Sequence, residues 1–253
     1  MNGDFAKRFH QQSTAEWRRS GLPAEKDWPE EWSRASFKAY PRAPRIPLAD
    51  PLLVNAPLGE ILSARHTSRS FHRQATLSFE EISTIIRSSA GIRGEDRTAE
   101  KSKRVYPSGG RRYPLEIYLC AERVSGLERG IYHFNVKDDA LELIGDGAAS
   151  PEFAGAIGYE WAKDASAFVL ITGVWDRTLE KYRDFGHRFV FIEAGHLTQN
   201  LQLVSESLGL AYASLAGFRE SKLDSLLMLE PSQETSLYLT AFGRATAASR
   251  ETA

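Results

Sequence analysis

The chain has 253 residues, of which 42% are hydrophobic, and its 32 basic side chains nearly balance 33 acidic ones. This length and composition allow a sizeable core in one large domain, alone or with an appendage. The lack of a basic excess argues against nucleic acid as the main partner. No apolar run approaches the ~18 residues of a membrane helix, and no secretory signal is recognisable, so we expect a cytoplasmic protein without membrane contact.

Residues 1–50 differ in composition from the rest of the chain. They carry three of the five tryptophans, Trp17, Trp28 and Trp32, together with several prolines and many charges. The prolines of segment 37–48 bias their preceding residues away from helix, so this segment is expected to be extended. We predict that residues 1–50 form an N-terminal extension whose aromatic side chains pack on a body at 51–247, followed by a disordered tail at 248–253.

Two helices are predicted in the first part of the body. The first covers residues 57–65. The second begins after Ser78, which can form a capping box with Glu81, and ends near Gly91. The charged, apolar-poor run that follows, residues 93–104, is expected to be a mobile loop.

Apolar and β-branched runs predict the strands. These are residues 115–121, 131–134, 141–144, 167–175 and 235–243. The second and third are typical of a hairpin with Asp138 and Asp139 in its turn, and the continuous apolar run of the fourth is typical of a central strand. The only cysteine, Cys120, lies in the first run and fits a small buried hydrophobe.

Two further segments follow, a strand or loop at 210–218 and a short helix at 221–229. Strands interspersed with helices indicate an α+β or mixed α/β fold.

The most informative stretch is a long helix predicted from Phe189 onward, apolar on most sides. Glu193, His196 and Asn200 lie at offsets 0, 3 and 7, within about 60° of one another on a helical wheel. Polar groups in an otherwise apolar helix need partners. The stripe therefore predicts a polar seam paired with neighbouring loops, a cofactor pocket or a subunit interface.

Three other motifs could carry chemistry. In RHTSRSF, Arg65 and Arg69 can each donate two hydrogen bonds to a phosphate, and Thr67 can donate one to an oxygen. The alternative is that these cations only complement the dipole of the preceding helix. In YPSGGRRYP, adjacent glycines let a flat ligand approach the backbone, unless the segment is a plain loop. Lys181 and Tyr182 could supply a base if the lysine pKa falls; an exposed pair is the commoner alternative.

Other catalytic signatures are missing from the sequence. The six histidines never occur as H-x-x-x-H or beside C-x-x-C, so no metal site is expected. There is no dinucleotide-binding G-x-G-x-x-G after a strand, no P-loop and no nucleophile elbow.

Taken in order, these segments resemble the SagB-type dehydrogenases of the FMN-dependent nitroreductase superfamily, which oxidise thiazolines and oxazolines to azoles. The resemblance covers nearly the whole chain, through FHQQS, RHTSRSF, PSGGRRYPLEIYL, GIYHF, KYRDFGHRF, EAGHLTQNLQL, LGL, AGF and FGR. It implies an α+β, nitroreductase-like fold with a mixed, mainly antiparallel sheet flanked by helices. It also implies a homodimer through the long central helix, with FMN bound in clefts at the dimer interface.

The resemblance implies a set of FMN contacts: Arg65, Thr67, Arg69, Pro107, Ser108, Gly109, Ala216, Gly217 and Arg244. The first three would hold the phosphate, the ribityl chain and the pyrimidine edge, and the next three would line the isoalloxazine ring. A backbone N–H near Ala216 and Gly217 would face flavin N5, and Arg244 would bind phosphate. Thr67 stands where serine is common, and Ala216 where related nitroreductases often carry glutamate.

The resemblance also assigns roles to the two helix motifs. Lys181 and Tyr182 match the pair that transfers the proton in azoline dehydrogenases, while FMN N5 accepts the hydride. The residues expected to organise the interface and the cofactor's surroundings are Glu193, His196, Gln199 and Asn200. The substrate would be a small molecule or a modified peptide, and a cyclodehydratase or other biosynthetic protein could be a partner. The alternatives are an NAD(P)H-dependent nitro- or quinone reductase and a non-catalytic flavin-binding partner.

Overall fold

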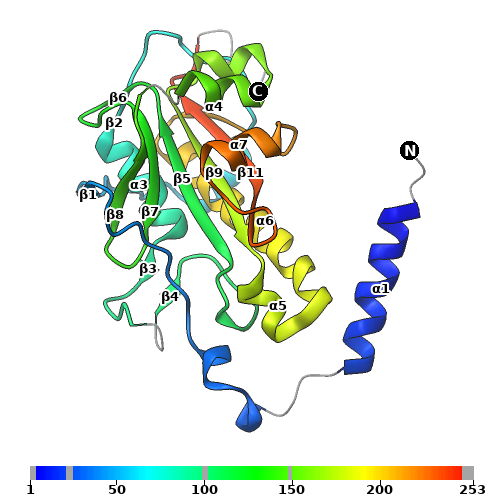
Figure 1. Cartoon of the computed structure of the whole chain (residues 1–253). Coiled ribbons are helices and arrows are strands. Elements are labelled where there is room, and N and C mark those ends of the chain that lie inside the picture. The colour runs from blue at the N-terminus through cyan, green and yellow to red at the C-terminus, as the bar shows by residue number, and fades with distance from the viewer. Residues whose placement is uncertain (1–3, 21–24, 99–101, 148–149, 247–253) are drawn as a thin grey trace.

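The computed structural model of the chain describes residues 4–20, 25–98, 102–147 and 150–246, so the predicted tail at 248–253 lies outside it (Figure 1). Its centre is a seven-stranded sheet in the order β1-β8-β7-β5-β9-β11-β10, and every neighbouring pair is antiparallel. The strands are β1 Arg45–Pro47, β5 Leu115–Ala121, β7 Gly130–Asn135, β8 Ala140–Gly145, β9 Ala167–Val174, β10 Ala211–Leu215 and β11 Glu234–Gly243. The expected α+β fold with a mainly antiparallel sheet is confirmed.

Strand β9 lies inside the sheet, as its continuous apolar run predicted. It pairs with β5 from Ala167↔Ala121 to Gly173↔Leu115 and with β11 on its other side. Such a run suits a strand covered on both faces. The hairpin of β7 and β8 also forms as predicted.

Helices cover both faces of the sheet (Figure 1). On one face pack α3 (Phe79–Ala90) and α6 (Gly186–Ser207), and α2 (Leu58–Ala64) lies against α6. On the other face pack α4 (Ser150–Ile157) and α7 (Glu220–Leu226). Two buried apolar clusters therefore exist, one on each side of the sheet.

Local signals fixed α3 well. Ser78 accepts a hydrogen bond from the backbone of Glu81, and the Glu81 carboxylate accepts one from the backbone of Ser78, which is the predicted capping box. Two short ladders flank it. In the first, β2 (Leu77–Ser78) pairs with β6 (Val124–Ser125).

The second ladder pairs β3 (Ile92–Arg93) with β4 (Lys103–Arg104). The ends of the predicted loop 93–104 are therefore paired strands, and its residues 99–101 lie outside the description.

Helix α6 has 22 residues and starts at Gly186, three positions before the predicted Phe189. Before it lies α5 (Asp176–Tyr182), which the sequence pattern did not predict because so short a helix shows little periodicity. Between them Arg183 adopts φ 49° and ψ −145°, so the two helices are not continuous. Helix α4 was missed for the same reason as α5.

The N-terminal extension contains a helix that its weak periodicity did not predict, α1 (Asp4–Ser20). Figure 1 shows it standing apart from the sheet, and its Phe5 is 78% exposed. Its attachment is partly polar, since the Arg188 guanidinium of α6 donates to the His10 carbonyl and to Ser13 and Thr14. The Phe9 ring adds an aromatic contact, with its centroid 6.0 Å from that of His187. The Trp17 side chain lies outside the description.

Two short 3-10 turns, η1 (Glu25–Asp27) and η2 (Glu30–Ser33), lie between α1 and β1. Three others lie in the body: η3 Gly109–Arg111, η4 Glu160–Asp164 and η5 Arg183–Phe185. The extended path predicted for 37–48 is interrupted at 41–43 by a turn, in which the Ala43 N–H donates to the Tyr40 carbonyl (3.0 Å), and it then continues into β1. Among the helices described, none is both long and apolar enough to cross a membrane.

Candidate functional site

The glycine turn of PSGGRRYP lies against the start of α6. Gly110 has φ 60°, and a Cβ there would overlap Tyr182 Oη and stand 3.0 Å from Lys181 Nζ. A side chain at this position would displace both groups, so glycine keeps them close to the backbone of the turn. Pro107, which opens the turn, is exposed.

Lys181 and Tyr182 end α5 and point toward this turn. Because both polar atoms approach Gly110, the pair is not the exposed surface feature that a lone Lys-Tyr dipeptide usually is. Only 2% of Lys181 is exposed. Burial raises the pKa of the Tyr182 phenol, which the nearby Arg112 partly offsets. The phenol is therefore neutral near pH 7.

Glu193 of α6 binds the same turn through hydrogen bonds. Its Oε1 accepts hydrogen bonds from Ser108 Oγ (3.0 Å) and from the Gly109 backbone N–H (2.9 Å). Its Oε2 has no hydrogen-bond partner within the part of the chain described. Burial raises the pKa of Glu193 to about 7, although both hydrogen bonds favour the ionised form.

The Ser108 hydroxyl is used within the chain. It donates to Glu193 and accepts from the Tyr113 N–H (2.8 Å). The sequence resemblance expected Ser108 to line the flavin, and any contact made by the turn must therefore come mainly from its backbone. We call Ser108, Gly109, Gly110, Lys181, Tyr182 and Glu193 the glycine-turn group.

The polar stripe predicted on α6 divides between two faces. Glu193 is buried, and Asn200 Nδ2 donates to the Ser89 carbonyl at 3.4 Å, so both face the body. His196 and Gln199 are exposed. Beside them Ile192 is 53% exposed, which makes the outer face of α6 partly apolar.

The residues of RHTSRSF form a second group at the other end of α6, which we call the arginine loop (residues 65–69). The Ser68 N–H donates to the Tyr212 carbonyl of β10 (2.9 Å), and Ser68 is buried. Thr67 and Arg69 are exposed and Arg65 is half-buried. These last three side chains make no hydrogen bond or ion pair with the described residues, so their donors are available to a ligand.

Arg244 lies beside the arginine loop but is already paired. Its carbonyl accepts from the His72 N–H (2.9 Å). Its guanidinium donates to Glu81 Oε2 (2.7 Å) and to the Thr76 carbonyl (3.3 Å). A phosphate at Arg244 would have to share the guanidinium with Glu81. Ala216 and Gly217 are exposed in the loop after β10.

The two groups contact α6 far apart. The glycine-turn group reaches it at Glu193, and the arginine loop reaches it at Glu206, whose Oε2 lies 3.8 Å from His66 Nδ1. Thirteen positions separate these contacts, about 20 Å along the helix axis at 1.5 Å per residue. One chain therefore presents the two halves of the predicted site at opposite ends of one helix.

Two further residues complete the surroundings of the glycine-turn group: the sequence did not point to Trp28, and it indicated Arg112 only as a charge in the YPSGGRRYP motif. Trp28 lies over Lys181, with its ring centroid 3.4 Å from Nζ. Arg112 is buried and donates to the carbonyls of Arg177 and Glu31, so it connects α5 with the N-terminal extension. The density of tryptophan in residues 1–50 was the only signal for Trp28, and it did not indicate a target.

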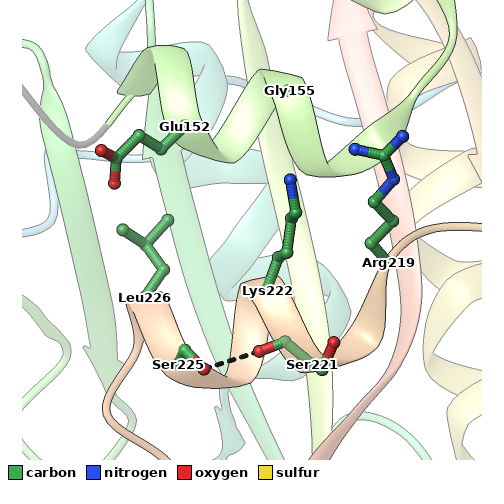
Figure 2. Close-up of a pocket in the computed structure, with 7 residues that line it drawn as sticks. All are labelled: Glu152, Gly155, Arg219, Ser221, Lys222, Ser225 and Leu226. Atoms are coloured by element: carbon green, nitrogen blue, oxygen red, sulfur yellow. Dashed lines mark hydrogen bonds between the residues drawn. The ribbon is translucent and has the colours of Figure 1, made fainter.

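A separate hollow of about 900 Å³ lies between α4 and α7 (Figure 2). Its charged lining residues are Arg219, Lys222 and Glu152, and the rest of the lining includes Ser221 and Ser225. It is on the face of the sheet opposite α6, and none of the predicted site residues line it.

The comparisons with known proteins agree with this fold. Residues 62–244 match the model of the nitroreductase family. MJ1384 of Methanocaldococcus jannaschii, assigned to the nitroreductases, is 30% identical over 188 residues, 74% of this chain and 90% of that protein. The microcin B17-processing protein McbC of Escherichia coli and the trifolitoxin-processing protein TfxB of Rhizobium leguminosarum bv. trifolii are each 29% identical. Those matches cover 56% and 55% of this chain, but only 54% of McbC and 39% of TfxB.

Solved structures show the same architecture. A chain of the E. coli microcin synthetase McbBCD complex with truncated pro-MccB17 has a TM-score of 0.63 at 20% identity, covering 96% of this chain and 92% of that one. A Desulfovibrio desulfuricans protein of the nitroreductase type, solved in complex with FMN, has a TM-score of 0.53 at 15% identity over 76% of this chain and 88% of that one. Together with the family match over residues 62–244, these findings place the chain in the nitroreductase family of oxidoreductases, and its similarity to McbC and TfxB confirms the resemblance to SagB-type dehydrogenases.

Proposed function

We propose that the protein is an FMN-dependent oxidoreductase that oxidises an azoline-type heterocycle or a related natural-product intermediate. The observation that carries this proposal is the convergence of Lys181 Nζ and Tyr182 Oη on Gly110, where a Cβ would stand within 3.0 Å of both. A flat ring substrate can lie against a backbone that carries no side chain, and a neighbouring base can then remove a proton from the ring. The similarity to two peptide-processing proteins supports this substrate class.

The arginine loop fits the anionic end of FMN. Arg65 and Arg69 carry guanidiniums without partners in the described chain, and these can bind phosphate oxygens in a bidentate manner. The Thr67 hydroxyl can donate to the polyol. When bound, FMN would supply hydride acceptance at N5. The protein supplies position and charge, and the FMN complex of a structural relative supports this cofactor.

A homodimer would bring the two groups together. Since they lie about 20 Å apart along α6 of one chain, we propose that each site takes its arginine loop from one copy and its glycine turn from the other. Exposed apolar side chains offer a surface for this contact: Leu58 (62%), Leu62 (53%) and Ile192 (53%) lie on α2 and α6, which pack together. Isolated exposed apolar residues are common, but a group of them marks an interface.

The structure favours a division of roles between the two catalytic candidates. The raised pKa of Tyr182 keeps its phenol protonated near pH 7, so we assign it the role of hydrogen-bond donor. Lys181 is then the base that removes a ring proton in its neutral form. Glu193 holds the turn against which the ring would lie.

The test is turnover of a defined azoline. The FMN-loaded protein is incubated aerobically with a peptide that contains a thiazoline, and the product mass is measured. Loss of two hydrogen atoms that depends on oxygen supports the proposal. Rapid anaerobic bleaching of the flavin by NADPH, without azoline turnover, would indicate a nitro- or quinone reductase instead, which the similarity to MJ1384 favours.

A colourless protein that takes up no FMN would support the non-catalytic reading. A partner is part of the proposal for a ribosomal substrate, because the similar chain in the microcin synthetase structure belongs to a McbBCD complex. Turnover that appears only after a ring-forming cyclodehydratase is added would support such a partner.

A further inference from the structure

The N-terminal extension covers Lys181. The turns η1 and η2, residues 25–33, place Trp28 with its ring centroid 3.4 Å from Lys181 Nζ, and Trp32 with its centroid 5.9 Å away. The Tyr182 ring stands 5.5 Å from the same nitrogen. Three aromatic rings thus surround an amine whose residue is only 2% exposed.

Gly110 closes the amine from another direction. A Cβ on Gly110 would be 3.0 Å from Nζ, so the nitrogen lies between the glycine turn and the Trp28 indole. With the indole in place Lys181 is only 2% exposed, so its amine has almost no open path to solvent or substrate. If Lys181 is the base of the proposed function, one of the two must move.

The glycine turn is the more firmly held of the two. Ser108 and Gly109 are bonded to the buried Glu193 carboxylate, and Ser108 also accepts from the Tyr113 N–H. Such buried hydrogen bonds resist local opening.

Residues 25–33 lie at the surface. Asp27, Pro29 and Glu30 are exposed, and the Arg112 guanidinium donates to the carbonyls of Glu31 and, just after the segment, Arg34. A cavity of about 650 Å³ lies beside the segment, lined by Trp32, Arg112 and Glu180 among others. This side of the lysine pocket can therefore open with little loss of core packing.

We propose that residues 25–33 form a lid over Lys181, with Trp28 as its closing contact, and that the lid opens to admit the substrate. This inference rests on the proposed role of Lys181 as the base and adds that substrate access to Lys181 is controlled by residues 25–33. In the closed state the indole covers Nζ, so opening exposes the amine to the substrate. A planar heterocycle fits the space that the indole leaves.

The test measures access to the amine, which needs no substrate. The FMN-loaded protein is treated with trinitrobenzenesulfonate at fixed pH, and labelling of each lysine is followed by peptide mass spectrometry. Lys163, whose side chain is 62% exposed, is the internal reference. Lys181 should label slowly in the wild type and about tenfold faster in Trp28→Ala, with Trp28→Phe close to wild type because it keeps a ring. Labelling of Lys163 should be the same in all three.

Equal Lys181 rates in wild type and Trp28→Ala, with unchanged melting temperatures, would overturn the lid. So would a wild-type Lys181 that labels as fast as Lys163. Should Trp28→Ala fail to fold, Trp28→Leu and Trp32→Leu provide the comparison: Lys181 should label faster than wild type in Trp28→Leu and at the wild-type rate in Trp32→Leu, and equal rates in the two would overturn the lid. Failure of azoline turnover with faster labelling of Trp28→Ala would remove the proposed function and leave the lid.

Discussion

The glycine-turn group and the arginine loop differ in how far the chain satisfies them. In the first, the polar atoms of Ser108 and Gly109 are bonded to a buried carboxylate. In the second, the side chains of Arg65, Thr67 and Arg69 find no hydrogen-bond or ion-pair partner in the described chain. The first group is largely bonded within the chain, and the second leaves its donors open to a ligand.

This difference separates chemistry from binding. A preorganised group does not need to be reordered during the reaction, whereas unused guanidiniums gain their partners only when an anion binds. Substitutions in the glycine-turn group should therefore change turnover or intrinsic stability, and substitutions in the arginine loop should change cofactor affinity. The following predictions test that division, from the largest expected effect to the smallest.

Lys181→Ala should reduce azoline oxidation about 10²- to 10⁴-fold, the usual contribution of a positioned general base. FMN occupancy, measured by absorbance, should stay at the wild-type level because Lys181 belongs to the glycine-turn group and not to the arginine loop. Lys163→Ala, at an exposed position, is the matched control. A wild-type rate in Lys181→Ala with full FMN would remove the assigned role.

Glu193→Gln should change how stability depends on pH. Burial raises the pKa of Glu193 to about 7, above its unfolded value. Below the unfolded pKa the carboxyl is protonated in both states. As pH rises toward 7 the unfolded chain releases this proton first, so wild-type stability falls, and above pH 7 the full cost of the buried charge is present. The variant lacks this loss while its amide oxygen can still accept from Ser108 and Gly109.

Relative to wild type, Glu193→Gln should therefore gain on the order of 2–3 kcal/mol in unfolding free energy between pH 5 and pH 8. Urea titrations at both pH values measure this gain. Glu160→Gln, whose wild-type side chain is 89% exposed, is the control and should not show it. Parallel stability profiles for Glu193→Gln and wild type would mean that the carboxyl does not titrate in this range.

Ile192→Ala should weaken the proposed homodimer by about 2 kcal/mol, because a two-fold interface loses the buried side chain twice. Sedimentation velocity over a dilution series gives the dissociation constant. Phe5→Ala, which removes an exposed apolar residue of α1, is the control. A monomeric wild-type protein that still binds FMN fully would contradict assembly of the site from two copies.

Arg65→Ala should raise the Kd for FMN about tenfold, the lower end of the roughly 1.5–3 kcal/mol of a hydrogen bond to a charged group, because Arg69 and Thr67 remain to bind the anion. Arg69→Ala should act similarly. Fluorescence titration with FMN measures both, and Arg73→Ala, at a side chain that is 85% exposed nearby, is the control. Unchanged FMN affinity in Arg65→Ala and Arg69→Ala would mean that these two cations only complement the dipole at the C-terminal end of α2.

The sequence predicted those elements whose signals are local. The capping box of Ser78 and Glu81 defined α3, and the apolar run at 167–175 defined β9, because neighbouring residues decide both. Helices α1 and α5 were missed, since the first carries few apolar residues and the second is only one or two turns long.

The candidate site divides in the same way. The motifs around Arg65, Gly109 and Lys181 could be found in the sequence, but not their distances from one another. The contacts of Trp28 with Lys181 and of Ser108 with Glu193 join residues that are far apart in the chain, and only tertiary packing brings them together. No periodicity reports such a contact.

Cys120 is the one thiol of the chain and is fully buried in the central strand β5. A buried, apolar thiol reacts slowly with maleimides and other alkylating reagents. A cysteine introduced on the surface would therefore be the single fast-reacting position in the native protein. Paired spin labels on the 25–33 segment and on α6 could then follow the distance between them by electron paramagnetic resonance, without first removing a native cysteine.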